Sequence, residues 1–326
     1  MPFTVRGLCA SLLWVLATTS TAFAQTPPPP NPPASQDQEP TTLDDVTVAA
    51  TPLQRTVRAF VESVAAPAPG RKAAAWRDPI CVGVSGLRHD AAQAMADRVL
   101  DWGASLGLRT GEPGCAPNIF VVMTDDGNAT ARALVRARPR EFRTGASGID
   151  AGDVALERFQ TSDARIRWWH ISLPVNSFTG MPIIRLPGQF PFSAGRPIRS
   201  PADLGAYGNP VEPSRINERS RDDLMQVIII VEMRAFDEAN FTQVSDYVSM
   251  AALAQIDPET SPPTPSILHL FDQTRAQEPG LTRWDRAYLE SLYAVSTEVA
   301  GGTAGRVADG MASRLETDPP PTDPAP

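Results

Sequence analysis

The chain has 326 residues, of which 42% are hydrophobic and 20% are charged, so it can form a core and is not disordered as a whole. Its formal net charge of -8 argues against a nucleic-acid partner, because such proteins need a basic face. Lys72 is the only lysine, so a lysine-dependent phosphate loop or Schiff-base enzyme would have to use it, and no glycine-rich loop surrounds it.

The N-terminus has the pattern of a secretory signal peptide. Arg6 precedes the apolar run LCASLLWVL, and Ala22-Phe23-Ala24 matches the A-x-A cleavage pattern. We therefore expect residues 1–24 to be removed by cleavage after Ala24. The alternative, an uncleaved anchor, is disfavoured because the apolar core is shorter than the ~20 residues that span a membrane. The mature chain is expected to be periplasmic or secreted and not transmembrane.

Proline, with 33 residues, is about twice as common as usual, and two segments are especially rich in it. The segment 25–43, QTPPPPNPPASQDQEPTTL, predicts a disordered linker, and the acidic segment 316–326 predicts a disordered tail. Between them we expect an N-terminal α/β part over 44–150 and a C-terminal α+β part over 151–315.

The N-terminal part has a β-α-β-α order after a first helix. Thr51-Pro52 has the pattern of a helix cap followed by proline at the first helical position. Apolar runs and helical periodicity then predict a strand over 79–86, a helix over 89–106, a strand over 118–124 and a helix over 129–138. This order predicts one crossover unit.

Cys81 and Cys115 are the two cysteines of the mature chain. An even number in an oxidising compartment favours a disulfide, and each residue lies near the start of a predicted strand. We expect a bridge between them, with Cα atoms within ~7 Å. Two free buried thiols or metal ligation are the alternatives.

The C-terminal part is expected to surround a buried helix. The pattern predicts a helix over 153–160, strands over 165–175 and 225–233, a helix over 242–256, a helix opened by Thr282 and Asp285, and a last helix over 303–315. The helix 242–256 is apolar nearly all round, which is typical of the middle of a domain. The fold class is therefore α/β or α+β, either as two domains or as one continuous sheet.

The segment 176–222 is rich in Gly, Pro and Ser. It predicts a long irregular insert with at most a short strand over 182–186. Inserts of this kind usually cover or carry a site.

Two local motifs are candidates for a catalytic or binding site. The sequence G-V-S-G around Ser85 follows a strand, as in a nucleophile elbow, but Leu87 stands where that motif needs glycine and no acid is evident to orient His89. An ordinary strand-to-helix turn is favoured. Asp125 and Asp126 follow the second strand, where metals or phosphates often bind, but turn formation and helix capping are favoured.

The three histidines give no metal site. His89, His170 and His269 are far from one another and from the cysteines in the sequence, and their neighbouring acids form no recognised ligand spacing. We assign no metal ligand, no cofactor and no catalytic residue. The segment LDDVTVAATP (43–52) resembles the TonB-contacting box of outer-membrane receptors, but no plug or barrel follows, so an edge strand or loose lead-in is favoured.

The order of elements over 225–295 resembles the catalytic half of metzincin-type zinc proteases. In those proteins an edge strand precedes the zinc helix, and a Ser-Ile-Met type turn and a final L-T-x-x-D helix follow. This chain has Ser266-Ile267-Leu268 at the turn and Leu281-Thr282 with Asp285 at the final helix. The resemblance covers about 70 residues, and chance similarity is the alternative.

The counterpart of the zinc helix departs from that family's H-E-x-x-H pattern. Asp246, Tyr247 and Met250 stand where the two histidines and the glutamate are needed. The resemblance therefore implies the fold without the catalyst. A ligand set of Asp246 with His269 and His170 would need all three side chains within ~5 Å of one another, and we expect no stoichiometric zinc.

The mature chain also resembles a group of uncharacterised exported proteins of alphaproteobacteria. The shared features include AFVESVAAP, W-x-x-P-I-C-V-G-V, G-C-A-P-N-I, PSRI, SDYVSMAALA and LTRWDRAYLESLYA. That resemblance implies no activity. We expect a non-catalytic binding or scaffold protein of the envelope that contacts a partner protein or peptide through 176–222. The alternative is a periplasmic hydrolase with a composite active site.

Overall fold

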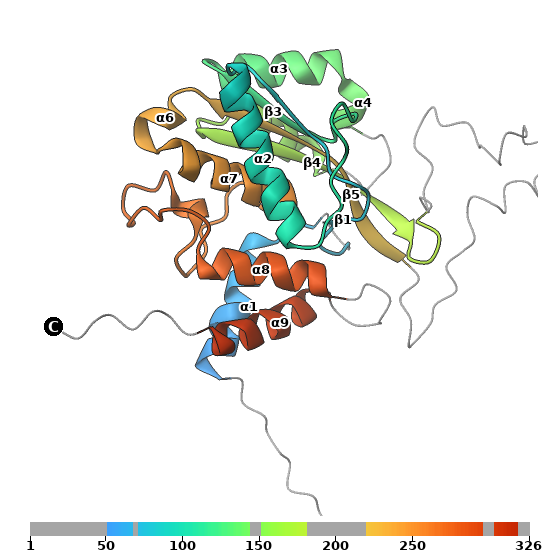
Figure 1. Cartoon of the computed structure of the whole chain (residues 1–326), viewed down its shortest axis with the longest axis vertical. Coiled ribbons are helices and arrows are strands. Elements are labelled where there is room, and N and C mark those ends of the chain that lie inside the picture. Colours follow the sequence, from blue (N-terminus) through green and yellow to red (C-terminus); the bar gives the residue numbers. More distant parts are fainter. Residues whose placement is uncertain (1–50, 68–70, 144–150, 181–219, 296–302, 319–326) are drawn as a thin grey trace, which may run out of the picture. The chain divides into compact units, whose positions relative to one another are not determined.

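The computed structural model describes residues 51–67, 71–143, 151–180, 220–295 and 303–318 (Figure 1). The predicted signal peptide (1–24), the linker (25–43) and the short strand over 182–186 lie outside the described residues. Most of the TonB-box-like segment (43–52) and of the insert (176–222) lies outside them as well.

The sheet is built around its longest strand, β5 (Ser220–Glu232). The C-terminal half of β5 pairs in parallel with β3 (Ile119–Thr124), its N-terminal end pairs in parallel with β1 (Ala75–Trp76), and β2 (Val82–Ser85) extends the sheet beyond β3. β4 (Ile166–Asn176) runs antiparallel along the other side of β5, which is its only partner among the described strands. The sheet is therefore mixed, and β4 is an edge strand.

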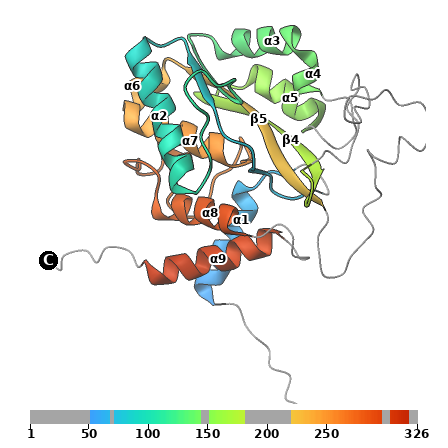
Figure 2. The ribbon, with the colours of Figure 1, turned by 45° about the vertical axis from the view of Figure 1, so that its right-hand side comes forward.

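Helices cover both faces of this sheet, as Figures 1 and 2 show. One face carries α2 (His89–Ser105) and α7 (Phe241–Leu253), and the other carries α3 (Gly127–Ala137), α4 (Pro139–Phe142) and α5 (Gly152–Thr161). The single turn α6 (Ala235–Glu238) precedes α7. Three further helices, α1 (Pro52–Val64), α8 (Arg283–Ala294) and α9 (Thr303–Thr317), pack against one another.

Side chains of β5 alternate between two apolar cores. Val227, Ile229 and Val231 face the core around α7, whereas Ile228 and Ile230 face the core below α3 and α5. A strand that is buried on both faces needs apolar residues at successive positions. This explains why the residues from Val227 to Ile230 of β5 are all apolar.

The structure confirms the α/β or α+β class and the predicted β-α-β-α order. β3, from the predicted N-terminal part, pairs with β5, from the predicted C-terminal part, so one continuous sheet contains strands of both. The two sides of the predicted boundary near residue 150 therefore contribute strands to the same sheet.

β5 begins at Ser220 rather than at 225, and the additional residues from Ser220 to Asp223 are polar. The Asp222 carboxylate accepts hydrogen bonds from the Arg71 guanidinium, and Arg221 forms an ion pair with Asp223 at 2.7 Å. These contacts come from distant segments or need the strand geometry itself, so local hydropathy could not indicate them. Helix α9 also continues to Thr317, into the segment that was predicted to be a disordered tail.

The two cysteines lie at disulfide distance, as predicted. The Cα atoms of Cys81 and Cys115 are 6.2 Å apart, and the bridge links residues 34 positions apart in the sequence. Cys81 precedes β2, and Cys115 lies in the turn that leads to β3. The bridge therefore ties together the entries of two paired strands.

Helix α7 is buried along nearly its whole length, as its sequence predicted. Every side chain from Gln243 to Leu253 is buried, and Met250 is 0% exposed. Asn240 begins the helix with a capping box that it shares with Gln243. The polar side chain of Asp246 accepts hydrogen bonds from Arg98 and Trp102 of α2 and from the backbone N–H of Leu281.

The last backbone carbonyl groups of α7 accept hydrogen bonds from side chains of other elements. The carbonyl oxygens of a helix's last turn have no partner within the helix. Here the carbonyl of Ala251 lies 2.7 Å from His170 Nε2, that of Ala252 accepts from Trp76 Nε1 at 2.8 Å, and that of Leu253 accepts from the Tyr293 hydroxyl. Three elements thus meet at one buried helix end.

Replacing Met250 by lysine should abolish cooperative folding, because an unpaired ammonium in a dry core costs several kcal/mol. Urea unfolding followed by tryptophan fluorescence measures this. Met233→Lys is the matched control, since Met233 is 39% exposed. An unchanged unfolding midpoint for the Met250 variant would contradict the buried position of α7.

Two tyrosines on α8 provide a test of the carbonyl capping. Tyr293→Phe removes the hydroxyl that donates to Leu253 and should lower the free energy of unfolding by about 1–3 kcal/mol, because a buried acceptor loses its partner. Tyr288→Phe should be neutral or stabilising, since the buried Tyr288 hydroxyl has no partner among the described residues. An equal loss of unfolding free energy in the two variants would show that the hydrogen bond from Tyr293 to Leu253 does not contribute to stability.

Candidate functional site

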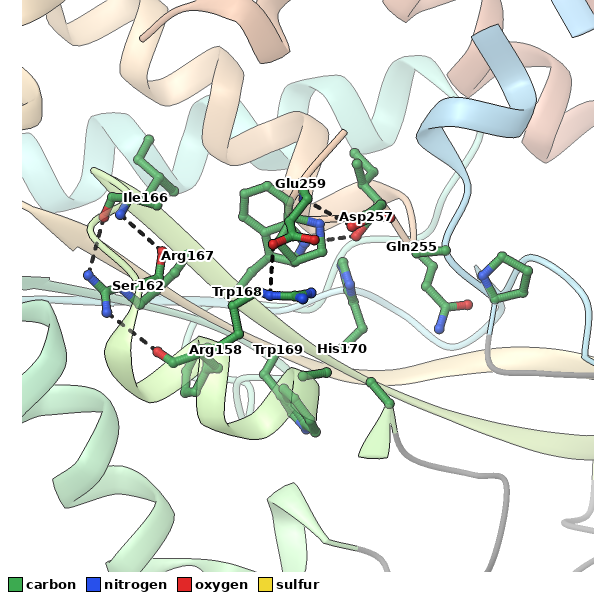
Figure 3. Close-up of a pocket in the computed structure, with 18 residues that line it drawn as sticks. Arg158, Ser162, Ile166, Arg167, Trp168, Trp169, His170, Gln255, Asp257 and Glu259 are labelled. Atoms are coloured by element: carbon green, nitrogen blue, oxygen red, sulfur yellow. Dashed lines mark hydrogen bonds and ion pairs between the residues drawn. The ribbon is translucent and has the colours of Figure 1, made fainter. Parts of the chain in front are cut away.

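A cavity of about 290 Å³ lies along the outer edge of β4 (Figure 3). Its floor is the strand from Ile166 to His170. One wall is α5 with Ala155, Arg158 and Phe159, together with Ala151 just before it. The other wall is the segment 255–259 that follows α7, together with Ala66 and Pro67, which follow α1. We call this cavity the edge trough.

Part of the β4 backbone turns away from β5 and towards the edge trough. The Glu232 N–H donates to the Arg165 carbonyl at 2.8 Å, whereas the Val227 N–H turns the other way and donates to Asn118 beside β3. Residues of an antiparallel pair alternate in this way, so Ile166, Trp168 and His170, which lie opposite Val231, Ile229 and Val227, direct their backbone groups away from β5.

No hydrogen bond joins these outward N–H and C=O groups to another residue in the described part of the chain. Such a row of groups is a template for pairing with another extended chain. The edge trough therefore combines an open strand edge with two walls.

The side chains of β4 are held firmly on both faces of the sheet. The Trp168 indole N–H donates to the Ile256 carbonyl at 3.0 Å, and its ring packs edge-on against Tyr247. Trp169 packs on the opposite face against Phe142 and Phe159. The free edge is thus presented by a strand whose side chains are fixed in two cores.

A buried ion pair lies at one end of the edge trough. Arg167 is 3% exposed and donates to Glu232 at 2.7 Å, and its guanidinium also contacts Asn128 and the carbonyl of Phe159. Arg234 pairs with the same Glu232 carboxylate. These contacts join β4 to β5, α3 and α5, so Arg167 has a structural role at this end.

His170 lies at the other end of the floor. Burial lowers the pKa of its imidazole to about 4, against an ordinary value of 6.5. The ring is therefore neutral at pH 7, and Nε2 donates to the Ala251 carbonyl as the protonated nitrogen. His170 therefore connects the floor of the edge trough to the carbonyl groups at the C-terminal end of α7.

The residues considered as an elbow or an anion site lie apart from the edge trough. Ser85 ends β2 in an exposed position, and Gly86 follows with φ of +85°. His89 begins α2 and is exposed. Asp126 accepts a hydrogen bond from the Ala129 N–H and caps α3, as expected for turn and capping chemistry.

The residues at the positions compared with the metzincin zinc helix make other contacts. Asp246 binds Arg98, Trp102 and the Leu281 backbone N–H, and Tyr247 and Met250 pack in the core. Over the described ranges, no group of three or more His, Cys, Asp or Glu side chains could hold a metal ion.

The turn over 266–268 is tied to the final helix by Asp285. The Asp285 carboxylate accepts from the Ser266 hydroxyl at 2.5 Å and from the Ile267 N–H at 2.8 Å, and it completes the predicted capping box with Thr282. His269, in the same turn, is buried, and burial lowers the pKa of its imidazole.

Sequence reasoning missed the edge trough. Its one signal is Pro174 in β4, because proline lacks a donor and is confined to edge strands or bulges. The structure shows a register shift between Ile171 and Ser172, just before this proline.

Comparisons of the chain with family models, with curated proteins and with solved structures found no match. Among the described residues, no helix has the length and apolar character that crossing a membrane requires.

The burial of His170 predicts a pH dependence of stability. Because its pKa is lower in the folded protein than in the unfolded chain, the unfolded state takes up a proton first as the pH falls. The buried, neutral imidazole of His170 therefore contributes to stability above pH ~6.5. This contribution is lost as the pH falls towards ~4, at up to about 1.4 kcal/mol per pH unit.

Urea unfolding of the wild type and of His170→Gln at pH 7, 5 and 4 measures this contribution. His269 titrates in both proteins and therefore cancels in the comparison. We expect the wild type to lose more stability than the variant between pH 7 and 4, and parallel losses would refute the assignment to His170.

Proposed function

We propose that this chain is an exported, non-catalytic binding protein that takes up an extended peptide segment as an additional strand on β4. The observation that carries the proposal is the backbone edge of Ile166, Trp168 and His170 on the floor of the edge trough, for which the described residues provide no partner. Main-chain hydrogen bonds would give affinity, and the walls would receive alternate side chains.

The walls of the edge trough suit apolar side chains of a bound strand. The α5 wall presents Ala151, Ala155 and Phe159, and the opposite wall presents Pro67 and Ile256. Alternate residues of an extended peptide point to opposite sides, so each wall would contact every second residue. Small or β-branched side chains fit these apolar parts of the walls.

Export is supported by two features of the chain. The sequence 1–24 has the pattern of a signal peptide cleaved after Ala24, and Cys81 and Cys115 lie at disulfide distance, as suits an oxidising compartment. A peptide or protein of the cell envelope is therefore the proposed partner.

Strand addition can be tested with a fluorescent peptide of alternating valine and threonine, roughly ten residues long, added to the full chain. Ala155→Phe fills the edge trough and should weaken binding about tenfold or more. Val154→Phe is the matched control, because Val154 is the neighbouring residue on α5, is 70% exposed and does not line the edge trough.

N-methylation of the peptide tests the backbone pairing itself. Methyl groups on one alternate set of amides should abolish binding, while methyl groups on the other set should have little effect, because only one set faces β4. Equal effects of both sets, or equal binding by the Ala155 and Val154 variants, would refute strand addition. Cleavage of the peptide would instead favour the alternative of a periplasmic hydrolase.

A further inference from the structure

The two walls of the edge trough carry opposite charges that meet across the free edge. Arg158 projects from α5, and its Nε lies 2.8 Å from Glu259 Oε1 on the opposite wall. Asp257 adds a second carboxylate to that wall and accepts a hydrogen bond from the Glu259 N–H at 2.9 Å. Figure 3 shows the ion pair passing in front of Trp168, the middle one of the three residues whose backbone groups face away from β5.

An incoming strand must therefore separate this ion pair. The Arg158 and Glu259 side chains are 44% and 56% exposed, and ion pairs at such positions contribute little to stability because water screens them. Each backbone hydrogen bond that a new strand gains is of comparable or greater strength. The ion pair can thus open in response to strand addition, and it leaves one free charge on each wall.

We propose that the ligand takes over both partners of this ion pair, so that the edge trough selects extended segments with adjacent residues of opposite charge. This inference rests on the proposed function. Neighbouring residues of a strand point to opposite walls, so an acidic residue can reach Arg158 while the basic residue next to it reaches Glu259 and Asp257. Residues two positions apart face the same wall and cannot do this.

Three probes distinguish these arrangements: the valine–threonine peptide, the same peptide with Glu and Lys at adjacent positions, and an isomer with Glu and Lys two positions apart. The adjacent isomer should bind the full chain about fivefold more tightly than the separated isomer. The difference should disappear in ~1 M salt, where screening acts within ~3 Å. Since both isomers have the same composition, net charge cannot cause the preference.

A charge reversal gives the sharpest test. Arg158→Glu makes both walls acidic, so this variant should prefer a peptide with two adjacent lysines over the adjacent Glu–Lys peptide. Arg136→Glu makes the same change in net charge on an exposed residue of α3 outside the edge trough, and it should keep the wild-type preference.

The outcomes separate this inference from the proposed function. If all three probes bind equally and the Arg158 variant changes nothing, the charge selection is refuted while strand addition stands. If none of the probes binds, strand addition and the inference that rests on it are both overturned. A shifted preference in the Arg136 variant would also refute the inference, because it would show a general effect of net charge.

Discussion

The end of a helix that is buried on all sides must find partners for its carbonyl groups without the help of water, and this requirement organises the fold around α7. A buried carbonyl without a partner costs about 1–3 kcal/mol, so several at one helix end would consume much of a domain's stability. Trp76, His170 and Tyr293 reach the last turn of α7 from β1, β4 and α8. The sheet and the C-terminal helices are thus fixed relative to one helix end.

The hydrogen bonds at the C-terminal end of α7 also fix the position of β4. Trp168 and His170 are held towards the end of α7, and Trp169 is held in the opposite core, so the strand is anchored through its side chains on both faces. Within the described part of the chain, no other strand pairs with its outer backbone edge. Natural sheets protect such edges with charges or covering segments, and here Arg158 and Glu259 cross it from the two walls.

Buried carboxylates serve as ties between elements. Asp246, at the position compared with a zinc helix, joins α7 to α2 and to Leu281 through four hydrogen bonds. Asp285 joins α8 to the turn before it and accepts bonds from Ser266, Ile267 and Thr282, while burial raises the pKa of its carboxyl. Carboxylates with this many donors are already satisfied, so their chemistry here is structural.

The sequence by itself determined the local elements, because helix periodicity and capping are encoded within a few residues. The helix start at Thr51, the capping box of Thr282 and the burial of the helix over 242–256 were all predictable in this way. The pairing of Cys81 with Cys115 followed from the two cysteines of the expected mature chain and their places near strand starts. Only the tertiary structure decided that β4 is an edge strand. Its side chains are buried on both faces, as in a central strand, and whether a neighbour pairs with its backbone depends on chain segments far away in the sequence.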